Sequence, residues 1–236
     1  MVNAPGLAVP GLLPTVTWAW SWVPPVGDDD VEARTWEADV AAMFDAWTAD
    51  SRVALTHGLP PELRGLAAPG SVGAEVTAWL RSRTVDLSPQ THVVWGAAFL
   101  TPERPRWAPV VAVVELSEPR ADDAGYLMDV VGTRGRPDDA RPPVVEYVTT
   151  DGGDGVRVTA LTRGTHGEAS VRVDAALRLD ATAVRGPLDV VVATRVHELG
   201  LFGLAGPGID QLLHAIAAEG TATTAPVPSS TTGRTP

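Results

Sequence analysis

The residues with the most familiar chemical signature are His197 and Glu198, which begin a His-Glu-Leu-Gly run. This run is like the first half of a zincin motif, in which a second histidine one helical turn later completes the pair of zinc ligands. Leu201 occupies that place, and the next histidine is His214. Because one of the two ligands is missing, we interpret the run as the end of a strand that leaves a sheet.

Three glycine-containing runs resemble known sites but lack a required residue. Gly-Gly-Asp-Gly at 152–155 begins like a calcium-binding nonapeptide, but Arg157 replaces the expected acidic ligand, so we predict a hairpin turn. Gly-Ser-Val-Gly at 70–73 lacks the first glycine of a nucleophile elbow, and Ser71 suits a helix N-cap. Gly-Pro-Gly at 206–208 lacks the third glycine of a dinucleotide loop.

Two charged segments also have structural interpretations. The aspartates at 28–30 lack the regularly spaced oxygen ligands that calcium needs, and Asp29 with Glu32 has capping-box spacing. The loop 133–141 contains three arginines and two aspartates, and we interpret it as a mobile, solvated loop rather than an anion site. The five histidines have no mutual ligand spacing. We therefore predict no catalytic residues, no metal site and no cofactor.

Composition narrows the class of protein. The chain has 236 residues, with 18 Lys+Arg against 29 Asp+Glu and a formal net charge of −11. This balance argues against nucleic-acid binding, which needs clustered cations, and against binding to an anionic membrane. Hydrophobic residues make up 44% and charged residues 20%, which is typical of a globular protein.

Cysteine and lysine are both absent from the chain. Disulfides, thiolate metal sites, Schiff bases and phosphate-loop lysines are therefore excluded. We see no signal peptide, and no apolar run approaches the roughly 20 residues of a membrane-spanning helix. We expect a soluble cytoplasmic protein without membrane insertion.

The elements that must position any site begin after a flexible segment at 1–14. Strict alternation predicts a strand over 15–23. A stripe at helical spacing, which includes Trp36, Val40 and Phe44, predicts a first helix, and Ser71 begins a second. Period-two patterns then predict strands near 92–100, 109–116, 126–131, 144–150, 155–163, 169–180 and 186–196, followed by a closing helix at about 208–219. We expect 15–220 to form one domain, and 221–236, rich in Thr, Pro and Ser, to be a disordered tail.

Two kinds of strand indicate the layers. The runs 109–114 and 188–193 are apolar at nearly every position, which implies burial on both faces. Along 169–180, by contrast, Arg172, Asp174, Arg178 and Asp180 alternate with apolar residues, so we expect this strand to keep one face in water. The pattern predicts an α+β fold, a mostly antiparallel sheet with helices packed on both faces.

Tryptophan is the unusual residue of this chain. All eight tryptophans lie at or before Trp107, and Trp18, Trp20 and Trp22 share one face of the first strand. They could form core, or they could form an aromatic surface for a partner or an apolar ligand. We expect Trp20 to be structural, and Trp18 or Trp22, nearer the strand ends, to be partly exposed and available to a partner.

The region from Val144 to Glu219 is predicted to contain four strands followed by a helix. It includes the runs Val-Arg-Val-Thr-Ala-Leu at 156–161 and Ile-Asp-Gln-Leu-Leu-His-Ala-Ile at 209–216. In element order and apolar pattern it resembles the C-terminal half of actinobacterial PsbP-like (LpqN-type) proteins. That resemblance implies a non-enzymatic accessory or binding protein with no catalytic residues. The alternative is the helix-grip fold of START-like lipid-binding proteins, but the predicted closing helix is short and the central strands look covered on both faces.

Three functions remain open. The first is a non-enzymatic accessory or adaptor protein that acts through protein–protein interaction. The second is a carrier of a hydrophobic small molecule, which the tryptophans and the helix-grip alternative suggest. The third is an enzyme whose Asp, Glu and His residues converge only in space, and we expect the first.

Overall fold

The computed structural model describes residues 16–27, 31–50, 72–101, 104–120, 124–164, 167–182 and 186–221. The expected flexible segment at 1–14, the tail beyond 221, the aspartates at 28–30 and Ser71 lie outside these ranges. Described elements follow the order β1 (Thr17–Trp22), α1 (Val31–Asp50), α3 (Val72–Ser82), β2 (Thr91–Thr101), β3 (Arg104–Ser117), α4 (Ala124–Val131), β4 (Val144–Thr150), β5 (Gly153–Arg163), β6 (Ala169–Thr182), β7 (Gly186–Val196), a 3₁₀ turn (Leu199–Leu201) and α5 (Phe202–Thr221).

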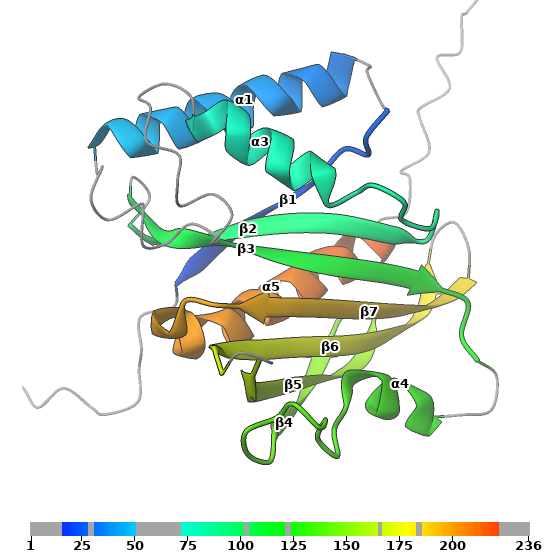
Figure 1. Cartoon of the computed structure of the whole chain (residues 1–236). Helices are drawn as coiled ribbons and strands as arrows, with labels where there is room; N and C mark the ends of the chain where they lie inside the picture. The colour runs from blue at the N-terminus through cyan, green and yellow to red at the C-terminus, as the bar shows by residue number, and fades with distance from the viewer. Residues whose placement is uncertain are drawn as a thin grey trace, which may run out of the picture.

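The seven strands form one antiparallel sheet in the order β1-β2-β3-β7-β6-β5-β4 (Figure 1). The predicted α+β class and the mostly antiparallel sheet are confirmed. Strands β4, β5, β6 and β7 form a meander, and the run at 152–155 belongs to the hairpin between β4 and β5, as expected. Strand β3 lies between β2 and β7, which places both doubly apolar runs in the middle of the sheet.

Helices lie on both faces, as predicted, but the expected burial of the runs 109–114 and 188–193 on both faces is wrong at Val113 and Ala193, which are exposed. On one face α5 packs against β6, and its Ile209 and Leu213 are fully buried in a core with Val173 and Val192. On the other face α1 and α3 pack over the β2 side of the sheet, where Phe44 and other apolar side chains meet. The shorter α4 packs on that same face, over β5, β6 and β7 (Figure 1).

The expected strand at 126–131 is wrong, because this segment is helix α4. Leu127 and Val131 are one helical turn apart, and both are buried against Val156 and Val158 of β5. The helix ends at Gly132, which has a φ of +72°, and the N–H of Thr133 donates to the carbonyl of Met128. Packing on the sheet therefore outweighs the strand preference of the valines.

The closing helix is longer than expected, because α5 has 20 residues and includes the run at 206–208. At two glycines of this run, side chains from other elements approach the helix backbone closely. A Cβ at Gly206 would collide with the guanidinium of Arg157, and a Cβ at Gly208 would collide with the ring of Trp18. These glycines therefore mark close packing within a helix, not a loop.

Candidate functional site

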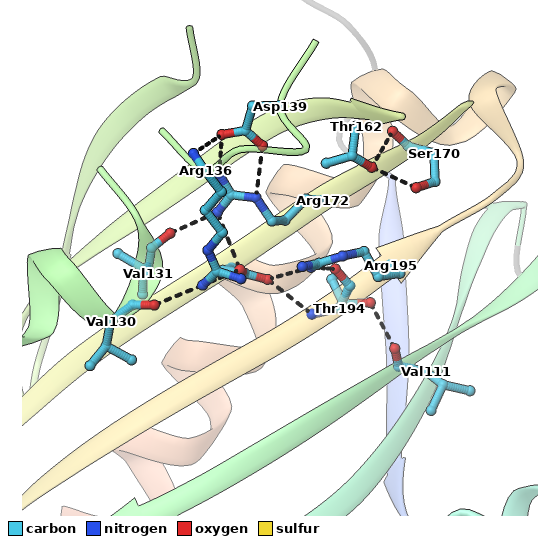
Figure 2. Close-up of polar contacts among 11 residues, drawn as sticks. Val111, Val130, Val131, Arg136, Asp139, Thr162, Ser170, Arg172, Thr194 and Arg195 are labelled. Atoms are coloured by element: carbon cyan, nitrogen blue, oxygen red, sulfur yellow. Dashed lines mark hydrogen bonds and ion pairs between the residues drawn. The ribbon is translucent and has the colours of Figure 1, made fainter. Parts of the chain in front are cut away.

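The described residues bring three arginines and two aspartates together on the face of the sheet that α4 covers in part. Arg172 and Asp174 come from β6, and Arg195 lies directly opposite Arg172 on β7. Arg136 and Asp139 come from the loop that follows α4 (Figure 2). We call these five residues the arginine–aspartate cluster.

Arg172 is the buried centre of the cluster, with a fully inaccessible side chain. Its guanidinium donates to Asp139 at 2.7 Å, to Asp174 at 3.2 Å and to the carbonyl of Val131 at 2.7 Å (Figure 2). Burial alone would lower the pKa of Arg172, but its hydrogen bonds and ion pairs with the two aspartates raise it. The buried guanidinium therefore stays charged, and it ties the loop after α4 to β6.

Asp174 joins the other two arginines to this centre. Its carboxylate lies 3.1 Å from the guanidinium of Arg136 and 3.0 Å from that of Arg195, and it also accepts from the backbone N–H of Thr194. Three guanidiniums and two carboxylates leave one positive charge in excess. The side chains of Arg136 and Arg195 are 33% and 37% exposed, so they present this charge to solvent.

Asp139 is held in its charged form. Burial would raise the pKa of this carboxyl, but the hydrogen bond from Arg172, the N–H of Arg136 and the charges of both arginines outweigh burial and lower the pKa below its ordinary value. A carboxyl whose pKa is lower in the folded state stabilises the fold above its unfolded pKa, and this contribution is lost as the pH falls.

We expect Asp139→Asn to weaken the protein at neutral pH and to matter less in acid. The difference in unfolding free energy between wild type and variant should be full at pH 7 and shrink as the pH falls below the ordinary carboxyl pKa of 3.8. Urea unfolding at a series of pH values measures it. Asp138→Asn, at the exposed neighbouring position, is the control and should follow the wild-type curve. A difference that stays constant with pH would refute the assignment.

Beside the cluster, the helices of the described ranges leave a strip of the sheet uncovered. Val113 of β3 is 38% exposed and lies opposite the exposed Ala193 of β7. One step further along, the exposed Glu115 lies opposite the half-buried Val191. We call these four residues the β3–β7 strip. The strands β3 and β7 that carry it run between α1 and α3 on one side and α4 on the other (Figure 1). Arg195, two residues beyond Ala193 on β7, borders it.

The tryptophans of β1 divide between core and surface. Trp18 is only 7% exposed, so the expectation that it is partly exposed is wrong: it packs beneath α5 against Gly208, and its ring stacks on Trp20 at 5.3 Å. The indole N–H of Trp20 donates to the carbonyl of Gly208 at 3.0 Å, which makes it structural. Trp22 is 37% exposed and meets His92 edge to face. Of the two predicted partner-binding residues, Trp22 alone is at the surface, and its partner role stays a prediction.

The His-Glu-Leu-Gly run lies apart from the contacts of the cluster. His197 follows the end of β7, and the carboxylate of Glu198 accepts from the N–H of Gly200 in the 3₁₀ turn, as expected for a strand leaving the sheet. Within the described ranges, no three His, Asp or Glu side chains converge as they would around a metal ion.

The chemistry available at the cluster is binding rather than proton transfer. Guanidinium groups donate hydrogen bonds in a planar fork and stay charged at physiological pH, so Arg136 and Arg195 suit anionic groups such as carboxylates. The buried carboxylates are saturated by arginines, which leaves them poorly placed to accept a proton from a substrate.

Sequence reasoning missed the cluster in two places. The expectation that 169–180 keeps a wet face is wrong for Arg172 and Asp174, whose side chains are at most 1% exposed. The loop 133–141 is not fully solvated, because the side chain of Asp139 is only 3% exposed. The available signal was the presence of both arginines and aspartates in each of these two segments, which allows them to pair with one another when buried.

No protein-family model matches this chain, and no curated protein or solved structure gives a significant match. None of the helices in the described ranges has the length and apolar character needed to cross a membrane.

Proposed function

We propose that this chain is a non-enzymatic accessory or adaptor protein, and that it binds another protein through the β3–β7 strip. The supporting observation is the strip itself, where apolar side chains of central strands reach the surface beside two partly exposed arginines. A cytoplasmic location and a PsbP-like arrangement belong to the same proposal.

Central strands of a sheet are normally covered, because an apolar face must pack against another layer. Here Val113 and Ala193 lie on β3 and β7, in the middle of seven strands, and both are exposed. The contact would join an apolar centre to a polar, charged rim, the usual anatomy of a protein–protein interface. Arginine is also enriched among the residues that contribute most to such interfaces.

The chain's helices bear on the choice between the two fold resemblances. The 20 residues of α5 remove the objection that the closing helix is too short for a helix-grip fold. The presence of helices on both faces of the sheet still favours the PsbP-like hypothesis. On the face where a helix-grip protein would hold its ligand, Ile209 and Leu213 pack directly onto the sheet, which argues against the carrier function.

We expect Val113→Asp to abolish partner binding without unfolding the protein. The exposed position tolerates a charge, whereas a carboxylate at the apolar centre of an interface would have to lose its water. The measurement is co-purification of the partner with the tagged full-length chain, alongside the melting temperature of each variant.

Val144→Asp is the matched control, because Val144 is also an exposed valine on a strand, at the far edge of the sheet on β4. It should leave co-purification intact. Equal co-purification with the wild type and both variants would contradict the proposed surface, and loss with Val144→Asp alone would move the interface to β4.

A further inference from the structure

We propose that the partner presents an amphipathic helix to the β3–β7 strip, with an acidic residue beside Arg136 and Arg195 and a basic residue beside Glu115. This inference rests on the proposed function and specifies the chemistry of its partner. It follows from the hydrogen bonding of the strands and from the order of charges along the strip.

The occupant is a helix because the strip offers a face and not an edge. Strand β3 is hydrogen-bonded to β2 and β7, and β7 to β3 and β6, so neither strand can take up an added strand. A sheet face is covered by side chains from another layer, and helices α1, α3 and α4 already cover this face on either side (Figure 1). One more helix between them would complete the layer.

The pairing register fixes the order of charges on the strip. Arg195 lies at one end, the Val113–Ala193 pair lies in the middle, and Glu115 opposite Val191 lies at the other end. Arg195 and Val191 are four residues apart on one strand, which is about 13 Å at ~3.3 Å per residue. A helix rises about 1.5 Å per residue, so 13 Å corresponds to about nine residues, and the nearest spacing that keeps the complementary acid and base on one face is about eight residues.

The positive end is built to hold a carboxylate. Asp174 binds both Arg136 and Arg195, at 3.1 and 3.0 Å, which keeps their guanidiniums near one another. Because Asp174 and Asp139 are already shared with the buried Arg172, the two outer arginines keep one unbalanced positive charge. Arginine pairs with carboxylates through two parallel hydrogen bonds, which gives direction as well as attraction.

The test places a benzophenone amino acid at position 193 of the full-length chain and irradiates the cells that produce it. We expect a covalent adduct with one partner, and mass spectrometry of the joined peptide should show an acid and a base seven or eight residues apart around an apolar residue. Val144 carrying the same group is the control site, and it should give no such adduct.

Charge variants then test the orientation. Arg195→Gln, which can still donate to Asp174, and Glu115→Arg, at an exposed position, should each lower the adduct yield about tenfold, because each removes or reverses a complementary charge. Arg134→Gln is the control, because Arg134 is 84% exposed and pairs with Asp129 away from the cluster. Melting temperatures identify any variant whose loss comes from unfolding.

The outcomes separate the two proposals. A wild-type adduct whose yield neither charge variant changes would overturn the inference and leave the proposed function standing. An adduct of two copies of this 24.7 kDa chain, or a link within one chain, would overturn the partner helix. No adduct at position 193 would overturn the proposed function as well.

Discussion

Replacing Asp174 with alanine should lower the free energy of unfolding by about 3–5 kcal/mol, because it removes one of the two carboxylates that balance the buried guanidinium of Arg172. The Asp174 side chain is 1% exposed and contacts three guanidiniums, one of which, Arg172, is fully buried. A typical domain is stable by about 5–15 kcal/mol, so this loss is a large fraction of the total. Urea-induced unfolding, followed by tryptophan fluorescence, measures it.

Two further variants distinguish this effect from ordinary loss of an ion pair. Asp129→Ala removes an exposed partner of Arg134, and it should cost about 1 kcal/mol or less. The triple variant Arg172→Met with Asp174→Leu and Asp139→Asn removes the buried charges together, so it should be more stable than Asp174→Ala alone. Equal stability of Asp174→Ala and Asp129→Ala would show that the cluster does not hold the fold together.

The second large effect is expected at Trp18. Truncation to alanine should cost about 3–5 kcal/mol, because it opens a cavity between β1 and α5. The indole is 7% exposed, stacks on Trp20 and packs against Gly208 of the helix. The melting temperature and the urea midpoint of the purified variant measure the loss.

Trp22→Ala is the matched control on the same strand. Trp22 is 37% exposed, and its described ring contact is the edge-to-face pair with His92, so its loss should cost about 1 kcal/mol or less. Similar destabilisation by both variants would contradict the division of this strand into a buried and an exposed part.

Strand periodicity was sufficient to predict most of the sheet, because each strand has at least one apolar face. The helix α4 was not predictable from that pattern, because a short run such as 124–131 satisfies either period and its packing partners lie on β5. The N-terminal end of α5 could not be predicted from the sequence for a different reason. Arg157 and Trp18, which are distant in sequence, approach the helix backbone closely at Gly206 and Gly208.

The cluster was unpredictable because its members neutralise one another only in the fold. Asp139 and Arg172 are 33 residues apart, and Arg172 faces Arg195 only through the register of β6 and β7. From the sequence alone, the arginines and aspartates of the cluster are therefore predicted to be exposed to solvent. Their burial depends on α4 and the loop after it, which bring Arg136 and Asp139 over the sheet.

Hydroxyl-radical footprinting of the chain, free and with its co-purified partner, tests the proposed binding surface most directly. Val113 is 38% exposed and Tyr147, on the edge strand β4, is 77% exposed, so both should be oxidised in the free chain. Binding through the β3–β7 strip predicts that the partner protects Val113 and Arg195 and leaves Tyr147 unchanged. Protection of Tyr147 with unchanged oxidation of Val113 would contradict it.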